Sequence, residues 1–109
     1  MKLIRDHIPE IMKSLGKIPK VRELSESEFK RAIIQKLVEE VQELQHALND
    51  YELFPTSAVL DEVIYEVGDI RDVLDQIMKL YGISEELLEE ARERKNAHNG
   101  SFEKRLYLE

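Results

Sequence analysis

Glu39-Glu40-Val41-Gln42-Glu43 and Glu66-Val67-Gly68-Asp69 are two acidic clusters, and each lies inside a run of apolar residues with helical spacing. In these clusters Glu40 and Glu66 occupy positions where the apolar pattern would place Leu or Val. A carboxylate that faces a helical core is costly unless it is paired or binds a cation. The two clusters therefore predict a pair of packed helices with a candidate metal site between them.

The apolar residues around each cluster follow the heptad rhythm of a buried seam. The earlier seam consists of Ile33, Leu37, Glu40, Leu44 and Ala47. The later seam consists of Val59, Val63, Glu66, Ile70, Val73, Ile77 and Leu80. In each seam a single Glu replaces a single hydrophobic residue.

Each expected helix carries a second acid one turn from the seam Glu. At about 100° per residue, Glu43 lies roughly 60° from Glu40, and Asp69 has the same relation to Glu66. Antiparallel packing across a short connection at residues 50–56 would place the two pairs opposite each other. Two carboxylates about 4 Å apart repel by roughly 4 kcal/mol at an effective dielectric near 20, so the cluster should take up protons or divalent cations. Oxygen-only ligation favours Mg²⁺ or Mn²⁺ over zinc.

Acidic strings of this kind also arise on solvated helix faces, where they pair with Lys or Arg one turn away. The seam positions of the two Glu residues favour the metal site over that alternative. Glu39, beside the ligand pair, is expected to accept a proton from a water in the site. The other nearby acids are expected to be surface residues, namely Glu62, Asp72 and Asp75. The N-terminal cations Lys2 and Arg5 are expected to be solvated surface charges.

The rest of the chain reads as further helices and connectors. A short helix is expected at residues 6–16, with Asp6 or His7 as its cap. The capping box Ser25-Glu26-Ser27-Glu28 opens a helix to about Asn49, and Phe54-Pro55-Thr56-Ser57 leads into a second helix that ends before Gly82. Ser84 caps a last helix that reaches roughly His98.

These elements predict an all-α helical bundle. It has two long antiparallel helices with short N- and C-terminal helices, in one domain over residues 1–109. Apolar seams on more than one side of the long helices indicate that homo-oligomerisation completes the core, with a homodimer or homotetramer expected. Gly68, inside the second long helix, marks either close approach of a neighbour or a tolerated small residue.

Composition excludes several classes of function. The 23 acidic and 16 basic side chains leave a net charge of -7, which argues against a general nucleic-acid or anionic-membrane binder. The absence of cysteine excludes disulfides, iron-sulfur clusters and thiolate zinc sites. The chain start lacks the apolar core of a signal peptide, and no apolar run has membrane-spanning length, so a cytoplasmic protein is expected.

The acidic pattern resembles the signature of the MazG-like all-α nucleoside triphosphate pyrophosphohydrolase superfamily, EExxE followed by ExxD on the next helix. The resemblance extends to both ends of the chain. The opening Lys2-Leu3-Ile4-Arg5-Asp6-His7-Ile8-Pro9-Glu10 is similar to the KLVRDKIPE start of a small-protein, phosphoribosyl-ATP pyrophosphohydrolase-like branch. The C-terminal pattern of that branch is matched by Lys95, Gly100, Phe102 and Tyr107-Leu108-Glu109.

This resemblance implies hydrolysis of a nucleotide between its α- and β-phosphates, with release of the monophosphate and pyrophosphate. It also implies Mg²⁺, or Mn²⁺, held by four carboxylates: Glu40, Glu43, Glu66 and Asp69. Glu39 would be the catalytic residue that orients or deprotonates the attacking water. Two alternatives remain: phosphoribosyl-ATP as the substrate, or a non-catalytic helical assembly in which the acids only set register.

Two residues near the C-terminus are candidate substrate contacts. Lys95 follows Leu88 and Ala91 along one line of the last helix, so its ammonium is expected to face the bundle opening and a phosphate. Asn99, one turn further on, is a second candidate phosphate contact, and its alternative role is to end the helix. An aromatic that stacks on the base would be Tyr51, Phe54 or Phe102, and the sequence does not choose among them.

Overall fold

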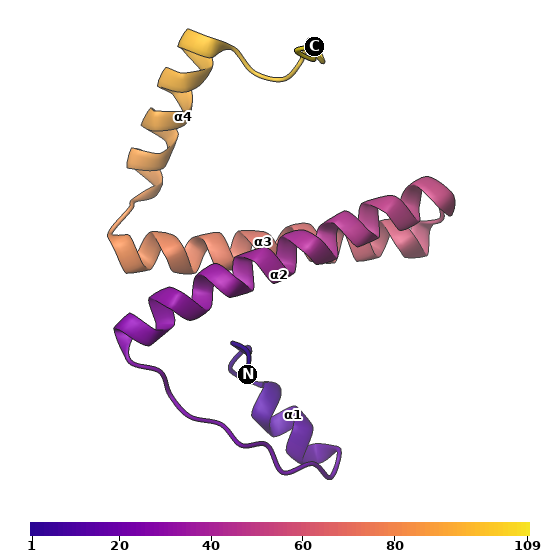
Figure 1. Cartoon of the computed structure of the whole chain (residues 1–109), viewed down its shortest axis with the longest axis vertical. Helices are drawn as coiled ribbons and strands as arrows, with labels where there is room; N and C mark the ends of the chain where they lie inside the picture. The colour runs from indigo at the N-terminus through magenta and orange to yellow at the C-terminus, as the bar shows by residue number, and fades with distance from the viewer. The chain divides into compact units, whose positions relative to one another are not determined.

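The computed structural model describes residues 1–109 and contains helices without any strand (Figure 1). The helices are α1 (Ile8–Ser14), α2 (Glu26–Leu53), α3 (Ser57–Tyr81) and α4 (Glu85–Asn99). The predicted all-α class is therefore confirmed. The chain divides into two compact units, residues 1–77 and residues 78–109. None of the helices combines the length and the apolar character needed to cross a membrane.

The start of α2 is set by the predicted capping box. The Ser25 hydroxyl accepts a hydrogen bond from the Glu28 amide at 3.2 Å, and the Glu28 carboxylate accepts one from the Ser25 amide at 3.1 Å. Arg22 adds two hydrogen bonds to the same carboxylate, at 2.6 and 3.2 Å. These hydrogen bonds lower the pKa of Glu28 to about 2, and the bond from Arg22 has the largest effect.

The end of α2 differs from the prediction, because the helix continues past Asn49 to Leu53. The four added residues contain neither Gly nor Pro, so nothing local stops the helix before Pro55 disfavours helical dihedrals at Phe54. Only residues 54–56 then connect α2 to α3. Thr56 caps α3, since its hydroxyl accepts a hydrogen bond from the Val59 amide at 3.2 Å.

The two long helices lie side by side and antiparallel in the first unit (Figure 1). Both predicted seams point into this helical pair: Ile33, Glu40 and Ala47 of α2 and Val73 of α3 are buried. The remaining members of both seams are half-buried. The seam prediction is therefore confirmed, including the inward placement of Glu40.

A second row of apolar side chains on the same helices stays exposed. Each member directly follows a seam position in the sequence, so both rows keep the heptad spacing. On α2 the row consists of Ile34, Val38, Val41 and Leu48, and on α3 of Leu60, Ile64, Val67 and Leu74. We call these eight residues the outer seam. The helical pair thus carries an apolar face that the chain itself leaves uncovered.

The shorter helices begin as the sequence predicts. His7 is the N-cap of α1, and Pro9 lies in its first turn. Ser84 caps α4 by accepting a hydrogen bond from the Leu87 amide at 3.1 Å. Gly82 ends α3 with a φ of 64°, a left-handed conformation that favours glycine.

Gly68 does not mark a close approach within this chain. It is exposed, and a Cβ atom added to it would meet no atom within 4 Å. The alternative, a small residue tolerated on a helix surface, fits the structure.

Candidate metal centre

Four carboxylates from α2 and α3 converge midway along the helical pair. They belong to Glu40 and Glu43 of α2 and to Glu66 and Asp69 of α3, and their ligand oxygens all lie within 4.8 Å of one another. Glu40 is buried, Glu66 and Asp69 are half-buried, and Glu43 is exposed. The residues predicted as ligands therefore share one small volume that opens to solvent on one side. That they hold an ion stays a prediction.

Two oxygens of this cluster are buried without a hydrogen-bond partner. They are Oε2 of Glu40 and Oε2 of Glu66. Glu40 is only 5% exposed. Buried polar atoms almost always have a partner, so two such oxygens in one cluster need an explanation. A divalent cation supplies one, because carboxylate oxygens are the ligands that Mg²⁺ and Mn²⁺ prefer.

The carboxylates also perturb one another electrostatically. Burial, followed by the negative charges of Glu43 and Asp69, raises the pKa of Glu66 to about 7. A hydrogen bond with Glu43 and the charge of Glu40 act in the same direction. Without a cation, Glu66 thus takes up a proton near neutral pH, which agrees with the expectation from the sequence.

Lys36 of α2 is a member of the site that the sequence analysis missed. Its ammonium lies 3.2 Å from Oε1 of Glu40 and 3.5 Å from Oε2 of Glu39, and its side chain is only 18% exposed. Burial pushes the pKa of Lys36 down, but the hydrogen bond to Glu40 and both carboxylate charges outweigh that effect and raise it. Glu39 and Glu40 each lie one helical turn after Lys36 in the sequence, so this spacing alone indicates both ion pairs.

Glu39, the predicted catalytic residue, lies beside the cluster and outside the group of four. It is half-buried and shares the Lys36 ammonium with Glu40. This placement leaves the carboxylate near the candidate ligands and accessible to water. Its catalytic role stays a prediction.

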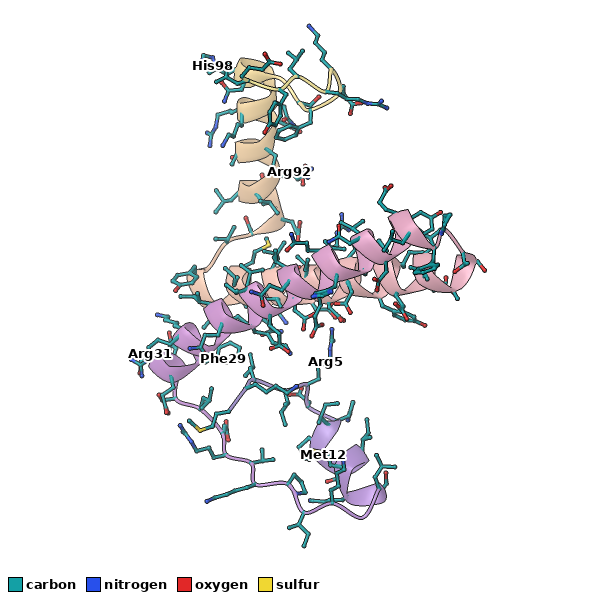
Figure 2. All side chains as sticks on the ribbon, turned by 45° about the vertical axis from the view of Figure 1, so that its right-hand side comes forward. Arg5, Met12, Phe29, Arg31, Arg92 and His98 are labelled. Atoms are coloured by element: carbon teal, nitrogen blue, oxygen red, sulfur yellow. The ribbon has the colours of Figure 1, made fainter.

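Arg5 and Asp72 lie at the surface, as expected, but they form ion pairs that the sequence did not indicate. Arg5 donates a hydrogen bond from Nη2 to Oδ1 of Asp69 at 2.7 Å and another from Nη1 to Oδ2 of Asp72 at 2.8 Å. Figure 2 shows Arg5 reaching from the N-terminal segment toward the helical pair. Its partners lie 64 and 67 residues away in the sequence, so no local spacing indicates the contact.

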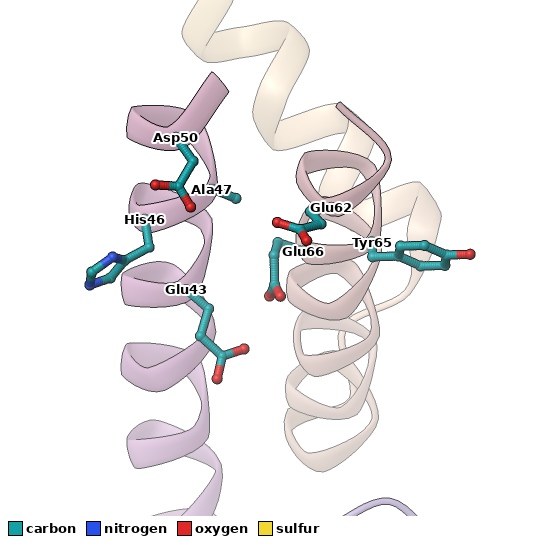
Figure 3. A pocket seen from close by; sticks show the side chains of 7 residues that line it. All are labelled: Glu43, His46, Ala47, Asp50, Glu62, Tyr65 and Glu66. Carbon is teal, nitrogen blue, oxygen red and sulfur yellow. The ribbon is translucent and has the colours of Figure 1, made fainter. Parts of the chain in front are cut away.

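A pocket of about 410 Å³ adjoins the acidic cluster and shares two of its carboxylates. Its lining residues are Glu43, His46, Ala47, Asp50, Glu62, Tyr65 and Glu66. In Figure 3, Glu43 and Glu62 face the space between α2 and α3, whereas the rings of His46 and Tyr65 point away from it. Glu62 is thus part of this pocket wall. The three aromatics considered for base stacking do not line it.

The predicted substrate contacts Lys95 and Asn99 both lie on α4, in the second unit. Both are exposed. Asn99 is the last residue of the helix, and Gly100 follows as its C-cap. The helix-ending role of Asn99 is therefore present, and phosphate contacts by Lys95 and Asn99 stay predictions.

Comparison with known proteins supports no family assignment for this chain. No family model matches the chain, and no solved structure matches it. An uncharacterized protein of Mycolicibacterium smegmatis (strain ATCC 700084 / mc(2)155) is 47% identical over 45 residues. That match covers 41% of this chain and 46% of the relative, so it spans less than half of either protein.

Proposed function

We propose that this protein hydrolyses a nucleoside triphosphate, or a related nucleotide, between the α- and β-phosphates in a Mg²⁺-dependent reaction. The observation that carries the proposal is the convergence of four carboxylates from two helices, with two buried oxygens left without a partner. The resemblance of the acidic motifs and of both chain ends to the MazG-like superfamily supports the choice of nucleotide.

In this proposal Glu40, Glu43, Glu66 and Asp69 hold the cation between α2 and α3. Mg²⁺ bound there would neutralise polyphosphate charge and polarise the phosphorus under attack, with Mn²⁺ as an alternative. Glu39 would orient the attacking water and accept its proton. Lys36 holds Glu39 and Glu40 in fixed positions one turn away, at 3.5 and 3.2 Å.

We also propose that a second copy of the chain covers the outer seam, which gives a homodimer as the minimal unit and permits a homotetramer. The outer seam presents eight apolar side chains on one helical pair. Its spacing on both helices matches that of the buried seams, so two copies are suited to pack as a four-helix bundle. Burial of such a face is the main driving force for association.

The decisive experiment measures Mg²⁺-dependent stability and turnover on the same variants. Glu40→Gln and Asp69→Asn keep side-chain shape and remove a ligand charge. Both should abolish the rise in melting temperature caused by Mg²⁺ and lower pyrophosphate release by at least about 100-fold, more than is typical for residues that merely support a ligand. The substrates are a panel of nucleoside triphosphates together with phosphoribosyl-ATP.

Asp75→Asn is the matched control, because Asp75 is an exposed acid on the same helix as Asp69. It should leave the metal response and turnover at the wild-type level. If Glu40→Gln and Asp69→Asn also retain both properties, the ligand assignment is wrong. A wild-type protein that responds to no divalent cation would point instead to a structural role of the acids.

A further inference from the structure

Arg5 is the exposed cation at the edge of the acidic cluster. Ion pairs with the cluster come from Lys36 and from Arg5. The Lys36 side chain is 18% exposed and is held by two acids of its own helix, whereas the Arg5 side chain is 56% exposed. A ligand that approaches from solvent therefore meets the guanidinium of Arg5 and not the ammonium of Lys36.

The two hydrogen bonds of Arg5 leave part of its donor capacity unused. Nη2 binds Asp69 and Nη1 binds Asp72, one bond each. A guanidinium has more N–H groups than these two bonds require, and its planar fork matches the oxygens of a phosphate. Exposed ion pairs contribute little to stability, so an anion can add to this arrangement or replace one Asp without a large loss.

The charge of the molecule makes further positive charge beside the metal site favourable for an anionic substrate. The chain has a net charge of -7, and four carboxylates converge at the cluster itself. Such a field repels a polyphosphate unless local positive charge offsets it. Arg5 already contacts Asp69, so an anion bound at the cluster lies next to its guanidinium.

We propose that Arg5 binds the polyphosphate of the substrate, and that Asp69 and Asp72 hold its guanidinium ready in the ligand-free protein. This inference rests on the proposed function, and it adds a substrate contact from the N-terminal segment to the ligands on α2 and α3. Arg5 recognises the polyphosphate independently of the base, and affinity rises with the number of phosphates.

The test uses the full chain with Mg²⁺ and inorganic tripolyphosphate as the probe. Arg5→Ala and Arg5→Gln should weaken tripolyphosphate binding by about 10- to 100-fold, as expected for loss of a hydrogen bond between charged groups. The same variants should raise KM for the nucleoside triphosphate by a similar factor and change kcat by much less. The melting-temperature rise caused by Mg²⁺ alone should persist. Arg5→Lys should retain part of the affinity, because Lys keeps the charge without the fork.

Arg22→Ala is the matched control, since Arg22 also forks onto a carboxylate, that of Glu28. It should bind tripolyphosphate like the wild type. Unchanged tripolyphosphate affinity in both Arg5→Ala and Arg5→Gln overturns the inference. So does a loss of the Mg²⁺ response in these variants, because Arg5 would then only position Asp69. A wild-type protein without any Mg²⁺ response overturns the proposed function as well, so the two failures are distinguishable.

Discussion

Glu66 combines the two properties that distinguish this site from an ordinary acidic surface. It takes a seam position of α3 that would otherwise hold an apolar residue, and its Oε2 atom is buried without a partner. Burial and three neighbouring carboxylates raise its pKa to about 7. A carboxylate in this position is destabilised in its charged form until a proton or a cation arrives.

The raised pKa of Glu66 predicts a pH-dependent stability of the metal-free protein. The folded-state pKa of about 7 exceeds the ordinary value of 4.5, so the folded state binds the proton more tightly than the unfolded state does. The resulting stabilisation is complete below pH 4.5 and is lost as the pH rises through 7. Mg²⁺ competes with that proton, so the melting-temperature rise caused by Mg²⁺ should grow over the same window.

Thermal melts at about pH 5.5, 7 and 8.5, with and without Mg²⁺, would measure this effect. Glu66→Gln should remove most of the pH dependence, because its amide does not titrate. It should also be more stable than the metal-free wild type above pH 7. A wild-type profile that stays parallel to that of Glu66→Gln would contradict the assignment.

At the scale of elements, the N-terminus of α2 shows how local chemistry sets a helix boundary. Ser25 and Glu28 exchange two hydrogen bonds, and Arg22 binds the same Glu28 carboxylate. All three residues lie within one short stretch, so the sequence predicts this boundary directly. The C-terminus of α2 lacks such a motif, and the predicted end was four residues short of Leu53.

The capping box predicts a stability change in acid. The pKa of Glu28 falls to about 2 from the ordinary 4.5, so the folded state binds the proton less tightly than the unfolded state. The stabilisation from Glu28 is present above pH 4.5 and is lost as the pH falls through 2. Glu28→Gln should therefore melt below the wild type at neutral pH, and the difference should shrink across this acid window.

Glu23→Gln serves as the control for this measurement, because Glu23 is exposed and lies outside the helix. Its melting temperature should follow that of the wild type at every pH. A constant difference between Glu28→Gln and the wild type from neutral pH to pH 2 would show that the carboxylate charge does not matter.

At the scale of the whole molecule, the main feature is that few apolar side chains are buried and many are exposed. Only three apolar side chains are buried, those of Ile33, Ala47 and Val73, whereas the outer seam remains exposed along α2 and α3. Large exposed apolar surface on a folded protein is typical of an interaction surface. Because the same heptad spacing runs along both helices, the proposed partner is a second copy of the chain.

This surface predicts a concentration-dependent homodimer that charge disrupts. In the proposed dimer, Ile34→Glu would remove an apolar contact worth about 1.5–3 kcal/mol and place a charge in the interface, so dimer affinity should fall by more than about 100-fold. Sedimentation or light scattering would show a monomer for this variant at concentrations where the wild type is dimeric. Ile18→Glu is the control, because Ile18 is exposed and lies outside the outer seam. A monomeric wild type would contradict the prediction.

Much of the fold and part of the candidate site could be predicted from the amino-acid sequence. Helix starts at Ser25 and Ser84 follow from side chains that cap nearby amides, and both buried seams follow from helical periodicity. The convergence of the four carboxylates required only these seams and a short antiparallel connection. Lys36 was also within reach of this reasoning, because its acidic partners lie one turn away.

The sequence by itself determined the helical class, the helix starts and the inward face of each long helix, because capping and periodicity act over a few residues. Only the tertiary structure decided that Arg5 joins Asp69 and Asp72, that Gly68 borders open space, and that the outer seam stays uncovered. The physical reason is range: a contact across 64 residues depends on how the N-terminal segment packs against α3, and no local pattern encodes that packing.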